Sequence, residues 1–256
     1  MSGKLQEWRE HKTAAHAVPF FAFLAFMSLG AVQERMGLTS GFAWDPWWKR
    51  EPNLWIYPLQ TVCIGAMLAF FWRNYTFRPV RGILLASVLG LLGILLWIAP
   101  GHVFWAAEMK EGWWKYFGFT DRSGVDKGGF DPNIMKEEGA ALYWGTVLFR
   151  FFRMVVVVAL VEEIFWRGFL MRYVLDFDGD FWKQPFGKAS VVSFLVVTGL
   201  VTVVHSPADW LAAFFWGSLV YFLAVRAKSL FACVWMHAVA NLVLGVYVMV
   251  TEQWGY

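Results

Sequence analysis

Two adjacent glutamates follow an unbroken apolar stretch of the chain. Glu162 and Glu163 come directly after the run 154–161, and a charged carboxylate inside a membrane costs roughly 2.5–3.5 kcal/mol on insertion scales. Arg167 lies four residues after Glu163, which is the spacing of an ion pair on one helix face. Glu162 points about 100° away from Glu163 on a helix. We therefore expect Glu163 to pair with Arg167, and Glu162 to stay available for acid–base chemistry in a water-filled cavity.

Histidines interrupt two further apolar stretches. His237 and Asn241 are four residues apart and share one helix face. An imidazole and an amide together supply the hydrogen-bond donors that stabilise an oxyanion. The alternative for this pair is hydrogen bonding between membrane helices, which is common for polar residues there. His205 ends another apolar stretch beside Pro207, and both a structural and a chemical role are open for it.

Other kinds of site fit the sequence less well. Two histidines and two glutamates are able to hold zinc, but the chain has no His-Glu-x-x-His motif. Ser206 follows His205 without the Gly-x-Ser-x-Gly pattern of a serine nucleophile. Cys63 and Cys233 fall in apolar stretches and are interpreted as small buried residues. The sequence therefore gives a metal site little support without excluding one, and we expect no cofactor.

The composition is typical of a protein with many membrane-spanning helices. Of 256 residues, 59% are hydrophobic and 16% are charged, whereas soluble domains have about 45–50% and 25%. The mean hydropathy is +0.49. The 17 Trp and 25 Phe suit the interfacial belts and lipid-facing surfaces of such a protein. The net charge of +3 is small, and no basic run suggests nucleic-acid binding. We predict an integral membrane protein that contacts the lipid bilayer and binds no nucleic acid.

The apolar segments predict an all-α bundle of seven to eight transmembrane helices around a central polar cavity. A spanning helix needs about 20 mostly apolar residues. The candidate spans are residues 15–33, 54–72, 82–99, 141–172, 190–205, 209–225 and 230–250. The fourth is too long for one simple crossing, so we expect it to start in the interface, to tilt, or to break near Arg150 and Arg153. Pro207 should end the fifth helix, and Asp209 should cap the sixth.

Lysine and arginine alternate between the connecting segments, and this bias sets the orientation. The positively charged segments are the N-terminal tail, 73–81, 172–188 and 226–229. The 206–209 turn and the C-terminal tail carry neither residue. The pattern predicts an internal N-terminus and an external C-terminus. Glu162 and His205 then lie at different depths if the fifth helix crosses the membrane fully. We therefore expect the fifth and sixth helices to be short and to turn around within the membrane.

The chain divides at about residue 140 into two regions of a single membrane unit. Residues 1–140 hold three membrane helices and end in a long aromatic-rich loop, 100–140. Residues 141–250 form the membrane core that carries the polar residues described above. Loops of this length are usually functional or disordered. We expect this one on the membrane surface, and a lid over the site is one of its possible roles.

The three polar interruptions, in this order, resemble the CPBP family, also called Abi or type II CAAX prenyl endopeptidases, which are intramembrane glutamic proteases. The family patterns Glu-Glu-x-x-x-Arg and His-x-x-x-Asn are matched in full at 162–167 and 237–241. In the pattern Phe-x-x-x-His, His205 matches and Val201 replaces the Phe. The resemblance covers residues 141–245. The aromatic-rich N-terminal part also resembles a bacterial subgroup of CAAX-protease-related proteins that accompany exosortase sorting systems.

The resemblance implies a peptidase with a CPBP-like catalytic core. Glu162, with His205, would activate a water for attack on a peptide carbonyl. His237 and Asn241 would stabilise the tetrahedral oxyanion. The second glutamate and the arginine would position these groups, and no metal would be needed. The substrate would be a membrane-anchored or lipidated protein, the location a bacterial inner membrane with the N-terminus in the cytoplasm, and an exosortase-type sorting system a partner.

Two other functions stay open at this stage. The same histidines and glutamates would serve a metal-dependent membrane protease, which a chelator would inhibit. Alternatively, the chain is a non-catalytic membrane partner of a protein-sorting system, and the departure at Val201 leaves room for this. A transporter is a poorer third, because the two halves of the sequence show no repeat.

Overall fold

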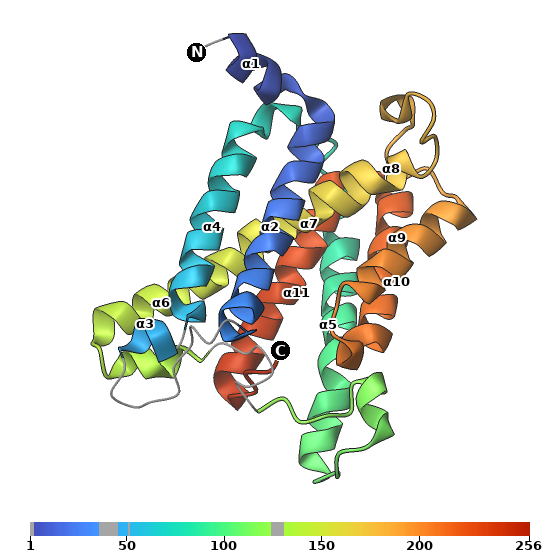
Figure 1. Cartoon of the computed structure of the whole chain (residues 1–256). Coiled ribbons are helices and arrows are strands. Elements are labelled where there is room, and N and C mark those ends of the chain that lie inside the picture. The colour runs from blue at the N-terminus through green and yellow to red at the C-terminus, as the bar shows by residue number, and fades with distance from the viewer. Residues whose placement is uncertain (1–2, 36–45, 51, 124–130) are drawn as a thin grey trace. The chain divides into compact units, whose positions relative to one another are not determined.

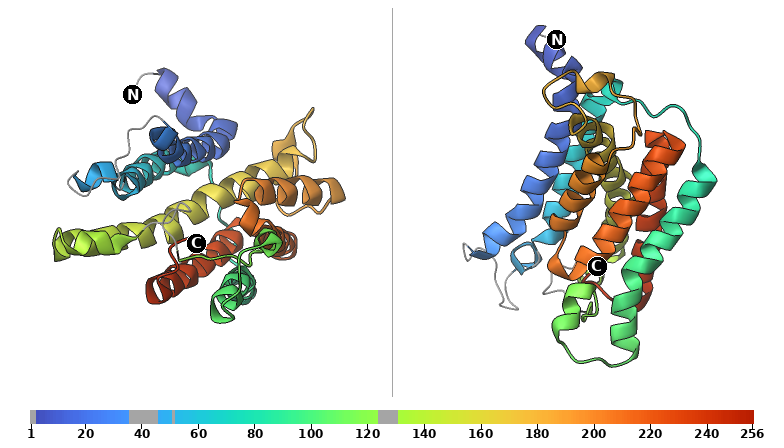
Figure 2. Two further views of the ribbon diagram at one scale, coloured as in Figure 1. Left: turned by 60° about the horizontal axis from the view of Figure 1, so that its bottom comes forward. Right: turned by 90° about the vertical axis from the view of Figure 1, so that its right-hand side faces the viewer.

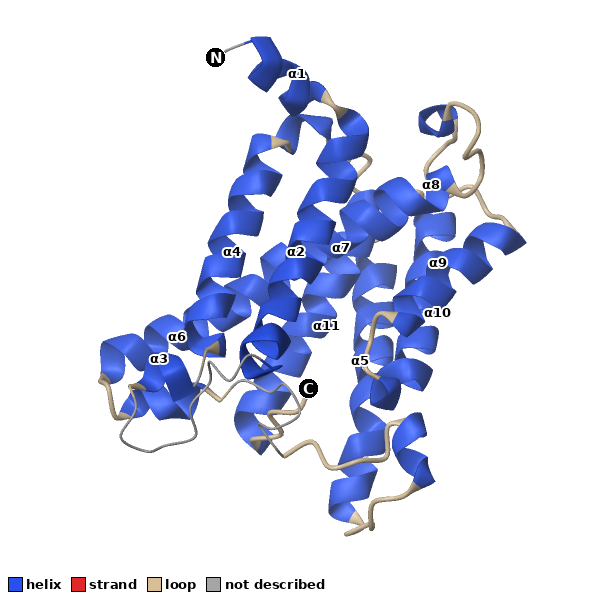
Figure 3. Cartoon of the chain, in the orientation of Figure 1, coloured by secondary structure: helices blue, strands red, loops and turns tan. Residues whose placement is uncertain are grey.

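Every regular element that the structure describes is a helix (Figures 1 and 3). The computed structural model describes residues 3–35, 46–50, 52–123 and 131–256. Their contacts define two compact units. The first unit is Met1–Tyr75 with Phe130–Val161, and the second is Thr76–Gly129 with Glu162–Tyr256. The predicted boundary at residue 140 divides the chain into two consecutive regions, whereas each of these units combines two separate segments. That boundary stays a prediction.

Six helices in the described part of the chain are long and apolar enough to cross a membrane. They are Lys12–Leu29, Asn53–Phe70, Ile83–Ala106, Ala140–Tyr173, Pro207–Ala227 and Leu230–Thr251. A further apolar helix, α9 (Val191–Val203), has 13 residues and rises only about 20 Å, less than the ~30 Å hydrocarbon core. The all-α membrane fold is confirmed. The predicted count of seven to eight is approached by these six helices and α9, but it is not confirmed.

The first unit is built on a helical hairpin. Its helices α2 and α4 run antiparallel, as two hydrogen bonds show. The Tyr75 hydroxyl, after the end of α4, donates to the carbonyl of Ala15 near the start of α2 at 2.7 Å. Gln60 Nε2, earlier in α4, donates to the carbonyl of Phe23, later in α2, at 3.0 Å. Arg153 Nε donates to Gln60 Oε1 at 2.8 Å, which ties the later part of this unit to the hairpin. The elements are α1 (Gly3–Glu10), α2 (Lys12–Arg35), α3 (Trp47–Arg50), α4 (Asn53–Phe70), η1 (Trp72–Asn74), η4 (Pro132–Lys136), α6 (Ala140–Phe152) and η5 (Arg153–Val158).

The fourth predicted span is one continuous helix of 34 residues, Ala140–Tyr173. Two of its segments have π-helical hydrogen bonding, η5 and η6 (Ile164–Leu170), and α7 (Ala159–Glu163) lies between them. Of the three alternatives given for this span, the break is therefore wrong, because the helix widens at Arg153 instead of stopping there. π-Helical turns are frequent at functional sites, and η6 begins directly after the two glutamates.

Three long helices lie side by side in the second unit: α5 (Ile83–Ala106), α10 (Trp210–Ala227) and α11 (Leu230–Thr251) (Figure 2). Helices α5 and α11 run parallel. Trp235 Nε1 donates to Ser87 Oγ at 2.9 Å near their starts, and the Tyr247 hydroxyl lies 3.3 Å from His102 Nδ1 near their ends. α10 runs antiparallel to them, since Arg81, just before α5, donates to the carbonyl of the last residue of α10.

Two glycines of α5 allow its neighbours to approach closely. A Cβ atom on Gly90 would lie 2.7 Å from the carbonyl oxygen of Met236 in α11. A Cβ atom on Gly93 would lie 2.8 Å from the ring of Trp216 in α10. Both distances are shorter than a carbon contact at its optimum of about 3.5–4.0 Å. The sequence Gly90-x-x-Gly93 therefore sets how α10 and α11 pack on α5.

The turn between α9 and α10 differs in part from its prediction. α9 ends before Pro207, as predicted, and a 3-10 turn (Pro207–Asp209) leads into α10. Asp209 stands at the N-cap of α10, but its side chain makes no capping hydrogen bond. It accepts instead from Arg122 Nη2 at 2.7 Å. α9 is short, as predicted, whereas the turn and α10 together are long enough to span a membrane, so the prediction of a short sixth helix is wrong.

The predicted loop 100–140 is partly helical. α5 continues to Ala106, and a 3-10 helix, η2 (Trp113–Phe117), follows it. The aromatic side chains of η2 are exposed. Residues 124–130 lie outside the described part of the chain. The second unit is completed by α8 (Met171–Tyr173) and η7 (Phe181–Lys183).

Candidate active site

The predicted ion pair between Glu163 and Arg167 is present and buried. Arg167 Nη1 donates to Glu163 Oε1 at 3.0 Å, and the side chains of Arg167 and Glu163 are 1% and 0% exposed. Arg167 Nη2 also reaches the carbonyl of Gly217 in α10 at 3.4 Å. Removing one member of such a pair leaves an uncompensated buried charge. The pair therefore fixes the π-helical segment η6 against α10.

The same carboxylate oxygen contacts His237 of α11, which the sequence did not predict. His237 Nδ1 lies 2.9 Å from Glu163 Oε1, and both side chains are buried. Because an ionised carboxylate only accepts hydrogen bonds, this contact assigns a proton to Nδ1. The other ring nitrogen, Nε2, is not engaged by Glu163. The other oxygen of the carboxylate, Glu163 Oε2, is buried and has no hydrogen-bond partner in the described part of the chain. No sequence spacing signals a contact between residues 74 positions apart.

Trp216 of α10 covers one side of His237. The two ring centroids are 5.2 Å apart with an interplanar angle of 73°, an edge-on arrangement. Trp216 is buried, and its ring occupies the space left by Gly93 on α5. The sequence does not point to Trp216, because nothing in it distinguishes this residue among 17 tryptophans. Gly93 therefore controls the position of His237 through the tryptophan ring.

Glu162 has a different environment from its neighbour. Its side chain is half-buried, whereas Glu163 is fully buried. Across the residues that the structure describes, Glu162 makes no hydrogen bond or ion pair. The 3.6-residue period of a helix turns adjacent side chains by about 100°, which accounts for the difference. Of the two glutamates, Glu162 is therefore the one whose carboxylate has no partner within the described ranges.

His205 lies in the turn after α9, and its ring is fixed by two neighbours. Nδ1 lies 2.6 Å from the carbonyl oxygen of Val201, and Trp97 of α5 packs edge-on at 5.3 Å between centroids. A carbonyl only accepts, so Nδ1 carries the proton and Nε2 of the neutral ring is an acceptor. The contact to Val201 uses the backbone, so replacing the family Phe leaves this hydrogen bond in place. Trp210 Nε1 also donates to the carbonyl of His205 at 3.1 Å.

One face of α5 connects the two histidines. Trp97, which contacts His205, lies one turn after Gly93. Gly93 leaves the space for the ring of Trp216, which contacts His237. Asn241 is half-buried on α11, one turn after His237. The structure thus brings together Glu163, Arg167 and His237 by direct contact. His205 contacts α5 through Trp97, but no hydrogen bond joins His205 to Glu162 in the described residues.

Arg122 fixes the turn that follows His205. Its Nη2 atom donates to Asp209 at 2.7 Å, and its guanidinium lies 4.8 Å from the ring centroid of Tyr256. The backbone N–H of Gly255 donates to the carbonyl of Arg122 at 2.7 Å. Burial raises the pKa of the Tyr256 hydroxyl above its ordinary range. The loop after α5, this turn and the C-terminus therefore form one packed cluster.

Metal-ligating side chains do not gather in the described residues. No group of three or more His, Cys, Asp or Glu that could hold a metal ion lies among them. Cys63 and Cys233 are both free thiols, and Cys233 is fully buried, as expected for a small apolar residue. The Glu163–His237 pair supplies two possible ligands at one point, and no third His, Cys, Asp or Glu of the described part of the chain joins them.

Comparison with known proteins gives one match. Residues 144–243 match a family model described as Rce1-like, type II CAAX prenyl endopeptidase Rce1-like. No curated protein and no solved structure matches the chain. All six candidate residues lie within the matched segment. The predicted resemblance to this family is confirmed, and the exosortase-associated subgroup stays a prediction.

Proposed function

We propose, from the premise that this chain belongs to the Rce1-like family of type II CAAX prenyl endopeptidases, that it cleaves its substrate by a glutamic mechanism. The family and the six apolar helices make the chain an integral membrane peptidase. The proposal adds the catalytic residues and the substrate class. One observation carries it: of two adjacent glutamates, Glu163 is engaged by Arg167 and His237, whereas Glu162 has no partner in the described residues.

Glu162 and His205 activate the attacking water in this mechanism. A general base needs an unprotonated atom at hydrogen-bond distance from the water. The contact of His205 Nδ1 with the carbonyl of Val201 supports this role, because it leaves Nε2 of the neutral ring as an acceptor. The water oxygen attacks the peptide carbonyl carbon, and its proton passes to Glu162. The same carboxyl group then gives the proton to the departing amine nitrogen.

His237 and Asn241 stabilise the negative charge that develops on the carbonyl oxygen. Donors aimed at such an oxyanion are usually the largest single term in acyl-transfer catalysis. His237 Nδ1 is held by Glu163, so Nε2 donates only when the ring is doubly protonated. Asn241 contributes its side-chain amide from one turn further along α11.

The substrate of this proposal is a membrane-anchored or lipidated protein. A peptidase whose polar residues lie on apolar helices meets peptide bonds at membrane depth, and an anchor or lipid brings them there. We also propose a bacterial inner membrane as the location, a cytoplasmic N-terminus, and an exosortase-type sorting system as a partner. The charge distribution and the resemblance to the bacterial subgroup support these points.

The test separates this mechanism from its two rivals. The full chain is purified, reconstituted in vesicles and incubated with membrane-anchored reporter peptides, with and without a chelator. We expect cleavage in both conditions and none by the Glu162→Ala/His237→Ala variant at equal inserted amounts. Loss of cleavage on chelation, with stoichiometric zinc in the purified protein, would establish a metal-dependent protease. A cellular phenotype that survives the double substitution would establish a non-catalytic role.

A further inference from the structure

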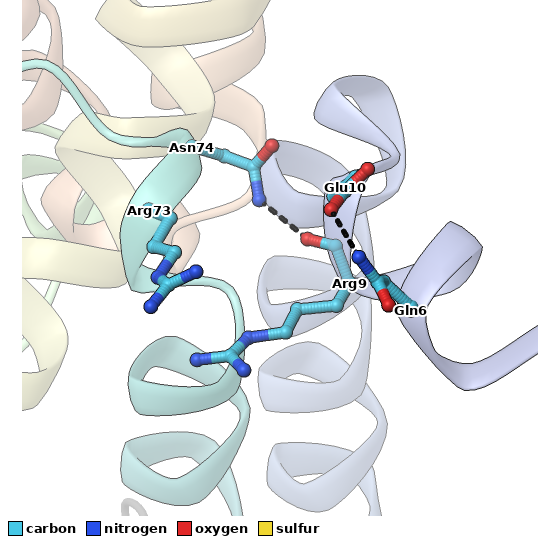
Figure 4. A pocket seen from close by; sticks show the side chains of 5 residues that line it. All are labelled: Gln6, Arg9, Glu10, Arg73 and Asn74. Atoms are coloured by element: carbon cyan, nitrogen blue, oxygen red, sulfur yellow. Dashed lines mark hydrogen bonds between the residues drawn. The ribbon is translucent and has the colours of Figure 1, made fainter. Parts of the chain in front are cut away.

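A polar pocket lies at one end of the α2–α4 hairpin in the first unit, outside the candidate active site. It has a volume of about 410 Å³ and is lined by Gln6, Arg9, Glu10, Arg73 and Asn74 (Figure 4). This volume falls within the ~300–1,000 Å³ of small-ligand sites. Residues from α1 and from the turn after α4 thus meet here, although they are more than 60 positions apart in the sequence.

Two guanidinium groups point into this pocket. Figure 4 shows Arg9 and Arg73 facing the same space from different elements. Arg9 is held in place, since its Nε donates to the carbonyl of Phe70 at 3.2 Å and Asn74 Nδ2 donates to the Arg9 carbonyl at 2.8 Å. Arg73 is exposed and makes no hydrogen bond or ion pair in the described part of the chain. Two like charges therefore lie together, and the guanidinium of Arg73 has no acceptor among the residues that the structure describes.

The negative charge at the pocket does not neutralise this pair. Glu10 lines the pocket, but its side chain is exposed and accepts from Gln6 at 3.2 Å. The lining residues carry two positive charges and one negative charge. The planar fork of an arginine matches the oxygens of a phosphate group. The pocket thus has the charge and the donors to hold a phosphate-bearing anion.

The position of the pocket relates it to the membrane surface. Its residues come directly before the first apolar span, Lys12–Leu29, and directly after the second, Asn53–Phe70. Trp8 and Trp72 flank it and are 55% and 51% exposed. Exposed tryptophans at the ends of membrane helices sit at the level of the lipid headgroups. The pocket therefore lies where lipid phosphates are concentrated.

We infer that Arg9 and Arg73 form a binding site for an anionic phosphate group, supplied by the headgroup of a lipid with net negative charge. This site is independent of the proposed peptidase mechanism and belongs to the first unit. A basic residue close to an anionic headgroup is worth roughly five-fold in affinity, and at this pocket the effect falls on Arg9 and Arg73, which face one lipid phosphate together. In the predicted orientation, the pocket faces the cytoplasmic leaflet, which carries such lipids.

The experiment measures lipid binding directly, without proteolysis. The purified full chain in neutral detergent micelles is titrated with fluorescent phosphatidylglycerol, and with fluorescent phosphatidylcholine as the neutral lipid. Arg73→Gln removes one charge without breaking an internal contact, and Arg9→Gln/Arg73→Gln removes both. Arg226→Gln is the matched control, because Arg226 is an exposed arginine at a helix end in the second unit. A parallel titration adds inorganic phosphate as competitor.

We expect phosphatidylglycerol to bind more tightly than phosphatidylcholine, and Arg73→Gln to weaken it by roughly five-fold. The double variant should weaken it further, and Arg226→Gln should leave it unchanged. Binding that persists in inorganic phosphate assigns the site to the lipid headgroup, whereas displacement assigns it to free phosphate. The inference is overturned if both lipids bind equally, or if Arg73→Gln and Arg226→Gln lose the same affinity, since surface charge alone would then act.

Discussion

The Nδ1 atom of His237 lies 2.9 Å from Glu163 Oε1, the oxygen that also accepts from Arg167. One buried carboxylate thus links α11 to the segment that carries both glutamates. The arrangement gives Glu163 a positioning role in the proposed mechanism, because it orients a ring without needing to touch the substrate.

Glu163→Gln is expected to destabilise the protein and to reduce cleavage. The amide leaves the buried Arg167 without a counter-charge, which typically costs about 3–5 kcal/mol. The free energy of unfolding in mixed detergent micelles measures this loss. The variant Glu163→Leu/Arg167→Met removes both charges, so it should regain much of the stability while cleavage stays low. Equal stability of Glu163→Gln and wild type would show that the ion pair is not needed.

Gly93→Ala is expected to disturb His237 from a distance. The added Cβ meets the Trp216 ring at 2.8 Å, and overpacking of this kind costs typically 1–3 kcal/mol. We expect lower stability and a lower cleavage rate, because the tryptophan ring that packs on His237 has to move. Gly199→Ala in α9 is the matched control, since nothing lies within 4 Å of its new Cβ, and alanine there should be neutral or stabilising. Identical behaviour of the two variants would contradict the packing argument.

A double-mutant cycle on Arg122 and Asp209 should give a favourable coupling. The pair lies at 2.7 Å and is largely buried, and contacting residues of this kind couple by roughly 0.5–3 kcal/mol. Arg122→Gln, Asp209→Asn and the double variant are compared by unfolding and by cleavage rate. The exposed pair Lys183 and Asp180 provides the control cycle and should couple weakly. Absence of coupling would show that the loop after α5 does not stabilise the turn that follows His205.

Much of the fold was predictable because membrane spans have a strong local signal. All seven predicted segments are helices in the structure. Their bounds differ by three residues or fewer, except that α5 continues seven residues beyond the predicted end, to Ala106. The end of α9 before Pro207 followed from the restriction that proline places on the preceding residue. The widening of the helix at Arg153 was not predictable, since π-helical and α-helical turns have the same apolar composition. The central polar cavity stays a prediction.

The candidate site was predictable where its contacts are local. The ion pair of Glu163 with Arg167 follows from a four-residue spacing, and the separation of the two glutamates follows from the helical period. The contact of Glu163 with His237 joins distant segments, so only the packing of α11 reveals it. The same holds for Trp216 and for Arg122. The sequence identified the residues able to do chemistry, and the structure added the residues that hold them.

The most direct test of the central claim compares Glu162→Gln with Glu138→Gln. Both variants replace one carboxylate by an amide of equal size, but Glu138 is exposed in the first unit. Cleavage of a membrane-anchored peptide is measured at equal inserted amounts and equal unfolding stability. We predict that Glu138→Gln cleaves like wild type and that Glu162→Gln loses about 10²–10⁴-fold in rate, as expected for a general base. Undiminished cleavage by Glu162→Gln would contradict the glutamic mechanism.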